Sequence, residues 1–366
     1  MHCWVFFLIW PIANACKIKK NTTKKWGQCG TRAAHYSGFV LFFMNTTKSK
    51  MAVGSGAASA PRKICVLGAG VVGLTTAWRV RQCFPNASIT LYADKFTEET
   101  TSHVAAGMFC PIARHVKTDR MDEIMAHSFN FFNQIVQSDE SLEAGISVVD
   151  GYQLYTTDIP PEEESFRNHV YHFSQVAPSS LTMIPDHSRI KRAYHYTTLM
   201  IECRKFLPYA MKKLKQMNVS MERRKIDNLQ QLEQENFDVI FNCCGLGSQQ
   251  LFDDGELKPM KGQLLRVVAP WIKRFIMVDD TTYIFPGQQL VVLGGVRQLD
   301  CGSLQVSEQD SEQIMKRCTA LVPSLVHATV DHVACGIRPS RSKLRLERDY
   351  FQFNNGTKTL LVHNYG

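Results

Sequence analysis

Two groups of residues in this chain have types and spacings suited to chemistry. Gly68, Gly70 and Gly73 form a Gly-x-Gly-x-x-Gly pattern, which is typical of a turn whose backbone amides bind phosphate. Much later comes Arg338, in GIRP, and a planar guanidinium can bind both oxygens of a carboxylate at once. Taken alone, however, Arg338 has a second interpretation as half of a surface salt bridge.

The segments around the glycines predict a nucleotide-binding unit. Residues 63–68 (KICVLG) form a short apolar run typical of a strand buried on both faces, residues 74–80 have helix-compatible spacing, and residues 88–92 (SITLY) predict a second strand. Strand, glycine turn, helix and strand is the order that dinucleotide binding requires, with the phosphates on the helix N-terminus. Asp94, just after the second strand, is the expected ribose-binding acid. The alternative is a tight turn without a ligand, which leaves Asp94 unexplained.

The segment after Asp94 indicates which family the chain resembles. Residues 95–111 (KFTEETTSHVAAGMFCP) are rich in hydroxyls and then in small residues, as expected of a loop that wraps a long cofactor. Together with the preceding Asp94, this segment resembles the D-amino-acid oxidase and D-aspartate oxidase family of flavoproteins. Further blocks follow in the family's order, including GYQLY, FDVIFNCCGLG, KGQ, YIFPG, GGVRQ and GIRP.

The resemblance implies FAD as the cofactor and assigns a set of residues to it. The implied FAD-binding residues are Gly68, Gly70, Val71, Val72, Gly73, Asp94, Lys95, Thr100, Thr101, Ser102, Ala106, Gly107, Met108, Ile226, Cys244 and Gly245. No metal is expected.

The resemblance also implies an α/β fold with two interleaved domains. The expected FAD-binding domain is Rossmann-like and combines residues 63–112, 205–258 and 339–366. The expected substrate domain is mostly antiparallel α+β and combines residues 113–204 and 259–338.

The chemistry implied by the resemblance is oxidation of a D-amino acid at its α-carbon. The cofactor carries the difficult step, so the protein supplies orientation and charge pairing. By resemblance, Arg338 binds the substrate α-carboxylate and Tyr283 adds a hydroxyl hydrogen bond. A tyrosine in such a strand is otherwise an ordinary core aromatic. The implied products are a 2-oxo acid, ammonia and hydrogen peroxide, with oxygen as the second substrate.

Arg297 bears on the choice of substrate. It occupies the position where the aspartate branch of the family has arginine, and a second arginine favours D-aspartate or D-glutamate over a neutral substrate. Where that branch commonly has another arginine, this chain has Met277, so recognition of the side-chain carboxylate is expected to rest on Arg297. Oxidation of neutral D-amino acids is the alternative, as is a sarcosine or glycine oxidase of the wider FAD family.

Composition excludes some other classes. A content of 45% hydrophobic residues over 366 residues is enough for a substantial core. The formal charge of +9 comes largely from lysines before residue 51, and no basic stripe interleaved with aromatics follows, so no nucleic-acid partner is expected. The cysteines are scattered and lack a Cys-x-x-Cys pair, which predicts reduced thiols. Oligomeric state is left open.

Both ends of the chain raise expectations of their own. Residues 1–62 are expected to lie outside the fold, as a targeting segment or an extension before Met51. The chain stops at HNYG, where the family continues into a flavin-contacting turn and a peroxisomal tripeptide. The resemblance therefore implies a peroxisomal parent protein, with cytoplasmic or secretory alternatives. It also raises the expectation of a truncated flavoprotein with weak flavin retention and little turnover.

Overall fold

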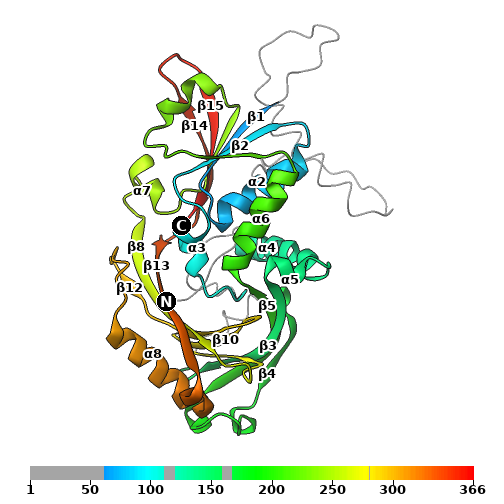
Figure 1. Ribbon diagram of the computed structural model, residues 1–366, viewed down its shortest axis with the longest axis vertical. Coiled ribbons are helices and arrows are strands. Elements are labelled where there is room, and N and C mark those ends of the chain that lie inside the picture. Colours follow the sequence, from blue (N-terminus) through cyan, green and yellow to red (C-terminus); the bar gives the residue numbers. More distant parts are fainter. Residues whose placement is uncertain (1–61, 111–119, 159–166, 280) are drawn as a thin grey trace, which may run out of the picture.

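The computed structural model describes residues 62–110, 120–158, 167–279 and 281–366. In this part of the chain, a six-stranded sheet and a nine-stranded sheet lie at opposite ends of an elongated molecule, with helices between them along one side (Figure 1). The predicted leader falls outside the described residues, apart from Arg62.

The six-stranded sheet has the order β14-β15-β7-β1-β2-β6. β1 lies between β2 and β7 and is parallel to both, while β14 joins β15 antiparallel at one edge. The chain thus leaves β1 toward β2 on one side and returns as β7 on the other, which creates a topological switch point at the end of β1. The strands are β1 (Lys63–Leu67), β2 (Ser88–Ala93), β6 (Ser220–Arg223), β7 (Val239–Asn242), β14 (Arg345–Gln352) and β15 (Lys358–Tyr365).

The nine-stranded sheet is largely antiparallel, and only β3 and β9 pair in parallel. Its path is β12-β8-β11-β10-β9-β3-β5-β4, and β13 pairs with β8 along that strand's whole length. The strands are β3 (Ile146–Tyr155), β4 (Tyr171–Val176), β5 (Arg192–Ile201), β8 (Lys258–Val268), β9 (Phe275–Val278), β10 (Thr282–Pro286), β11 (Val291–Gly294), β12 (Gln298–Leu299) and β13 (Thr329–Ser340).

The helices connect and cover these sheets. The α-helices are α2 (Val71–Cys83), α3 (Thr101–Val104), α4 (Met121–Val136), α5 (Ser141–Ala144), α6 (Cys203–Gln216), α7 (Gly247–Leu251) and α8 (Glu308–Leu321). Short 3-10 turns are η2 (Thr97–Glu99), η5 (Pro178–Ser180), η6 (His187–Arg189), η7 (Leu229–Glu235) and η8 (Pro323–His327). The predicted α/β fold, with its strand, glycine turn, helix and strand at the start, is confirmed.

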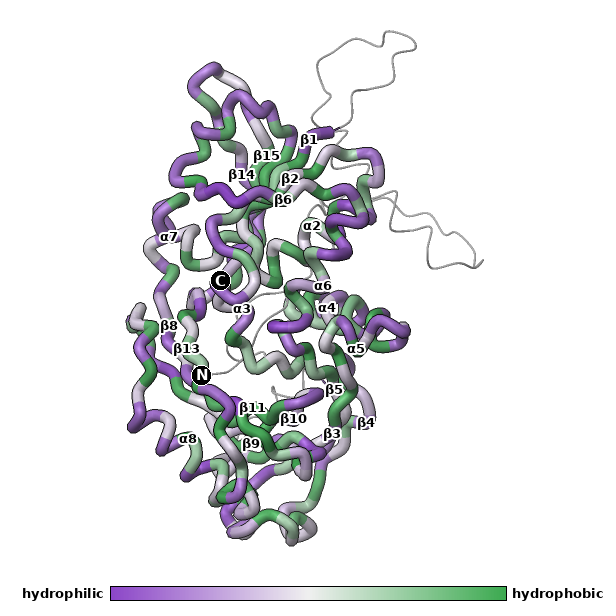
Figure 2. The backbone as a smooth tube through the Cα atoms, viewed as in Figure 1, coloured by the Kyte–Doolittle hydropathy of each residue, from purple (hydrophilic) through white to green (hydrophobic). Residues whose placement is uncertain are grey.

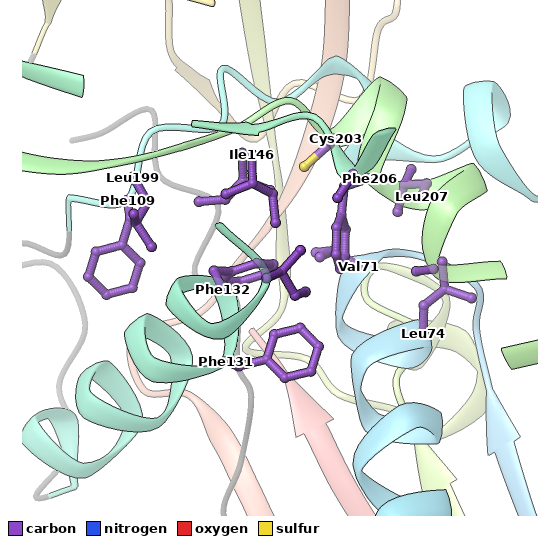
Figure 3. Close-up of a cluster of buried hydrophobic side chains, with 14 of the residues drawn as sticks. Val71, Leu74, Phe109, Phe131, Phe132, Ile146, Leu199, Cys203, Phe206 and Leu207 are labelled. Carbon is purple, nitrogen blue, oxygen red and sulfur yellow. The ribbon is translucent and has the colours of Figure 1, made fainter. Parts of the chain in front are cut away.

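The hydrophobic core runs through both sheets and the helices between them. Figure 2 shows hydrophobic residues concentrated along the central strands of each sheet. Between the sheets, aromatic side chains join the helices. Trp78 of α2 lies 5.4 Å from Phe131 of α4, measured between ring centres. Phe132 of α4 lies 5.2 Å from Phe206 of α6 by the same measure (Figure 3). Burying such rings contributes to stability and fixes the helices relative to one another.

The strands of each sheet come from separate stretches of sequence. The six-stranded sheet uses residues 63–93, 220–242 and 345–365, and the nine-stranded sheet uses residues 146–201 and 258–340. The predicted domain boundaries at 112, 204, 258 and 338 stay a prediction, and β13 continues two residues beyond the last of them.

Candidate active site

The glycine turn lies at the end of β1 and owes its shape to close backbone contacts. A Cβ atom on Gly68, whose φ is +102°, would lie 2.5 Å from the carbonyl oxygen of Cys243, and a Cβ atom on Gly73 would lie 1.9 Å from the carbonyl oxygen of Gly68. Both contacts are too short for any side chain. Gly70 faces Ser102, and the Val71 amide donates a hydrogen bond of 3.0 Å to the Ser102 hydroxyl. The later hydroxyl-rich loop is therefore fastened to the first turn of α2.

A cavity of about 750 Å³ begins at this turn and extends toward β13. Its volume lies in the upper part of the range for small-molecule sites. It brings together fourteen of the predicted site residues, namely Gly68, Gly70, Val71, Val72, Asp94, Lys95, Thr100, Thr101, Ser102, Ala106, Ile226, Cys244, Gly245 and Arg338.

The remaining predicted cofactor residues are not among those that line the cavity. Gly73 packs against Gly68, Gly107 approaches the Ile201 backbone at a φ of +92°, and Met108 forms an isolated bridge with Met200. Of these contacts, only that of Gly73 reaches a residue that lines the cavity, Gly68.

The cavity suits an elongated anionic cofactor at its β1 end. Residues at the start of α2 line it, and three neighbouring parallel strands end there, as dinucleotide binding requires. Asp94 follows β2 at the same edge, with an exposed side chain that can accept from a ribose hydroxyl. The residues present therefore fit FAD.

At the other end of the cavity, the Arg338 guanidinium occupies space that is free because residue 262 is a glycine. Gly336 of β13 pairs with Gly262 of β8, and the Arg338 guanidinium passes directly over Gly262. A Cβ atom on Gly262 would lie 2.3 Å from one of the Arg338 guanidinium nitrogens. The block KGQ thus contributes the space that the guanidinium occupies.

Tyr283 lies in β10, opposite Gly294 of β11. Its ring covers the Gly294–Gly295 pair, where Cβ atoms would lie 1.9 Å and 2.7 Å from ring carbons. The ring also stacks on Phe285, with ring centres 4.6 Å apart. Tyr283 is buried, and it is not among the residues that line the cavity.

Met277 sits directly across the sheet from Tyr283. It belongs to β9, pairs with Tyr283 of β10, and is buried. The two residues are therefore cross-strand neighbours in a hairpin. A buried methionine there offers no charge to a substrate.

Arg297 lies in the connection between β11 and β12, near enough to Arg338 for the two charges to interact, and like Tyr283 it is not among the residues that line the cavity. Its terminal nitrogens, Nη1 and Nη2, are buried and have no hydrogen-bond partner among the described residues. Burial, and next the charge of Arg338, lower the pKa of Arg297 to about 8. Two cations so placed repel each other, and a pair of carboxylates would relieve both the repulsion and the missing hydrogen bonds.

Two further arginines near these residues were missed by the sequence analysis. Arg266 of β8 is 2% exposed, donates to the Ala105 carbonyl at 3.2 Å, and has its pKa lowered by burial. Arg317 of α8 donates to the backbone beside Arg297. A charge inside the apolar run LLRVV was a usable signal for Arg266, whereas nothing in the sequence of α8 singles out Arg317.

A protein family described as DAO, FAD dependent oxidoreductase, matches residues 63–366, from the first residue of β1 through the whole site. The chain belongs to this family. It is accordingly an oxidoreductase, and FAD is its cofactor.

Curated relatives within this FAD dependent oxidoreductase family include oxidases of D-amino acids. The chain is 36% identical over 309 residues to D-aspartate oxidase of Homo sapiens, covering 83% of this chain and 88% of the human protein. It is 29% identical over 308 residues to D-amino acid oxidase of Dugesia ryukyuensis, covering 83% of this chain and 91% of that protein. The chain thus has the D-amino acid and D-aspartate oxidases among its relatives.

Solved structures show the same fold. Glycine oxidase from Geobacillus kaustophilus matches with a TM-score of 0.66 and 12% identity, covering 83% of this chain and 89% of that chain. L-alpha-glycerophosphate oxidase from Mycoplasma pneumoniae, solved with FAD bound, matches with a TM-score of 0.61, 12% identity and coverages of 83% and 89%.

The part of the chain that the structure describes shows neither a metal cluster nor a membrane-spanning helix. There, no cluster of three or more His, Cys, Asp or Glu side chains is arranged to hold a metal ion, and no helix has the length and apolarity needed to cross a bilayer. The nine cysteines in the same part are free thiols.

Proposed function

We propose that the protein oxidises acidic D-amino acids, D-aspartate and D-glutamate, to the 2-oxo acid, ammonia and hydrogen peroxide. The observation that carries this proposal is the pair Arg297 and Arg338, two neighbouring cations of which the first has no partner for its terminal nitrogens among the described side chains and backbone groups. A substrate with two carboxylates satisfies both guanidinium groups, whereas a neutral substrate leaves Arg297 buried and unpaired, which is costly.

The residues have distinct roles in this proposal. Arg338 binds the α-carboxylate through both oxygens, Tyr283 donates its hydroxyl to the same carboxylate, and Arg297 binds the side-chain carboxylate. Together they would hold the substrate in one orientation, which is the positioning that oxidation at Cα requires. FAD, when bound, supplies the chemistry by taking up the substrate's two electrons and passing them to oxygen. The resulting imino acid is then hydrolysed by water.

A second candidate is an oxidase of neutral D-amino acids. The observation that favours it is Met277, which places a buried, uncharged side chain across from Tyr283 where the resemblance leads us to expect another arginine. With methionine at position 277, only Arg297 is left to bind a side-chain carboxylate. The preference for acidic over neutral substrates is then weaker than with two arginines.

Peroxide release from purified, FAD-saturated protein tests the proposal against these alternatives. The substrates are D-aspartate, D-glutamate, D-alanine, L-aspartate and sarcosine. We expect kcat/KM for D-aspartate to exceed that for D-alanine at least about tenfold, since a buried charge pair contributes a few kcal/mol to recognition. A higher value for D-alanine or sarcosine would overturn the proposal.

The resemblance to peroxide-producing oxidases also supports the peroxisome as the site of action. Colocalisation of the tagged protein with a peroxisomal marker is the expected result. A cytoplasmic or secreted distribution would contradict it.

A further inference from the structure

The backbone that carries Arg297 is a short connection between two strands. β11 ends at Gly294 and β12 begins at Gln298, so only three residues lie between them. The Gly295 amide donates to the Thr281 carbonyl at 2.7 Å, and the Val296 amide donates to the Gln263 carbonyl at a longer 3.3 Å. The remaining polar group of Gly295, its carbonyl oxygen, faces α8.

Arg317 of α8 fastens this connection from outside the sheet. Its Nη2 donates to the Gly295 carbonyl at 2.9 Å, and its Nε donates to the Thr282 hydroxyl at 3.1 Å. Thr282 is the residue before Tyr283, and Gly295 is two residues before Arg297. One half-buried guanidinium therefore ties the strand of Tyr283 to the connection of Arg297. Within the described residues Arg317 forms no ion pair, and its guanidinium donates to the Thr282 hydroxyl and the Gly295 carbonyl.

The helix that carries Arg317 is itself fixed on the sheet. The side-chain amide of Gln263 in β8 donates to the Ser307 carbonyl at 2.7 Å, just before α8 begins. Near the other end, the Cys318 thiol lies 3.6 Å from the Tyr283 carbonyl. α8 is thus held against the sheet near both of its ends. This fixes the position of Arg317, and through its hydrogen bond the position of the Gly295 carbonyl.

We propose that Arg317 is a positioning residue for selectivity, one that holds Arg297 where it can bind the second carboxylate of the substrate. The inference rests on the proposed function and adds a residue that does not itself contact the substrate. A planar guanidinium suits the task because it can reach a hydroxyl and a carbonyl simultaneously, whereas lysine can bind only as a point charge.

Binding of two matched ligands that are not oxidised tests this inference. Succinate has two carboxylates and butyrate has one, with the same number of carbons, and each is titrated against the FAD-loaded protein while the flavin absorbance is followed. For Arg317→Met we expect the Kd of succinate to rise about tenfold and that of butyrate to stay within about twofold, because loss of a charge-assisted anchor shifts Arg297 alone. Lys316→Met, on an exposed neighbour in α8, is the control.

Two further variants separate positioning from general destabilisation. Arg317→Lys keeps the charge but cannot span both acceptors, and it is expected to recover only part of the succinate affinity. Adding Arg317→Met to Arg297→Met is expected to change the succinate affinity no further, because residues that act through one another are not additive. Additive losses, or an equal loss of butyrate binding, would refute the positioning role.

The controls distinguish this inference from the function on which it rests. If the unmodified protein binds succinate no better than butyrate, the proposed acidic selectivity is wrong. If it prefers succinate and Arg317→Met retains the full preference with unchanged flavin content, only the role of Arg317 is wrong. Should Arg317→Met fail to fold, Arg317→Gln, which keeps hydrogen-bonding capacity, carries the same comparison.

Discussion

Glycines make room for the side chains that are expected to bind the substrate. Arg338 lies over Gly262, and the Tyr283 ring lies over Gly294 and Gly295. In each case the functional side chain occupies the volume that a Cβ atom would otherwise fill. The placement of both side chains therefore depends on glycines in the neighbouring strand and connection.

Gly262→Ala tests this arrangement at the α-carboxylate end. The new methyl group would overlap the Arg338 guanidinium at 2.3 Å, so the guanidinium must move. We expect the Kd of butyrate to rise at least about tenfold, since small displacements in a binding constellation are costly. This Kd is measured by titrating butyrate against the FAD-loaded protein while the flavin absorbance is followed. Gly255→Ala, where a Cβ atom meets nothing within 4 Å, is the control. Equal butyrate affinity in both variants would contradict the role assigned to Gly262.

At this scale, the sequence singled out some residues of the candidate site and gave no sign of others. Arg297 and Arg338 stand in short glycine-containing blocks, and the structure brings them together. Arg317 lies in an ordinary amphipathic helix, and its hydrogen bonds reach residues 22 and 35 positions away. Contacts of that kind depend on how α8 docks on the sheet, which no local pattern records.

At the scale of elements, β7 and β15 share a buried polar pair. The Asn242 side-chain amide donates to Nδ1 of His363 at 3.0 Å, and the two residues stand in register on neighbouring strands. Burial, and then the charge of Arg345, lower the pKa of His363 to about 4. His363 is therefore neutral in the folded protein, with Nδ1 as the acceptor.

This pair predicts a pH dependence of stability. The unfolded chain takes up a proton at His363 near pH 6.5, whereas the folded chain does so only near pH 4. Stability from this group is therefore complete above pH 6.5 and is lost as pH falls toward 4, by about 3 kcal/mol in all. Denaturant unfolding at pH 7 and pH 5 measures it. In His363→Gln the free energy of unfolding should depend less on pH, whereas the exposed control His327→Gln should keep the original dependence. An unchanged dependence in His363→Gln would contradict the assignment.

Prediction succeeded best for elements with strong local signals. The run KICVLG and the following glycines predicted β1, its turn and α2, because a buried parallel strand and a phosphate-binding turn each have a characteristic pattern. For the hairpin of β9 and β10, by contrast, only Tyr283 was expected in a strand, and no strand was predicted at residues 275–278. Its short strands are fixed by their neighbours in the nine-stranded sheet, so the sequence alone carried little sign of them.

At the scale of the whole molecule, the cofactor loop and the substrate strand are joined. The Thr101 hydroxyl of α3 donates to the Ile337 carbonyl of β13 at 2.9 Å, one residue before Arg338. A Cβ atom on Gly336 would lie 3.3 Å from Val104, so α3 and β13 also pack tightly. The loop expected to contact FAD therefore bears directly on the residue expected to bind the α-carboxylate.

Thr101→Val tests this connection. It preserves the shape of the side chain but removes the donor, and we expect both FAD and butyrate to bind about fivefold more weakly, as loss of one hydrogen bond of about 1 kcal/mol implies. Fluorescence titration of FAD and absorbance titration of butyrate measure the two affinities. Ser180→Ala, on an exposed turn, is the control. A change confined to FAD would show that the loop and β13 act independently.

The central claim is that Arg297 selects substrates with a second carboxylate. D-aspartate and D-asparagine test it most directly, because one has a charged carboxylate where the other has a neutral carboxamide of nearly the same shape. Reduction of the bound flavin is followed by absorbance without oxygen, for the unmodified protein and for Arg297→Met. We predict at least about tenfold tighter apparent binding of D-aspartate, and loss of that difference in the variant. Equal reduction by both substrates in the unmodified protein, or a preference for D-aspartate that survives in Arg297→Met, would contradict the account.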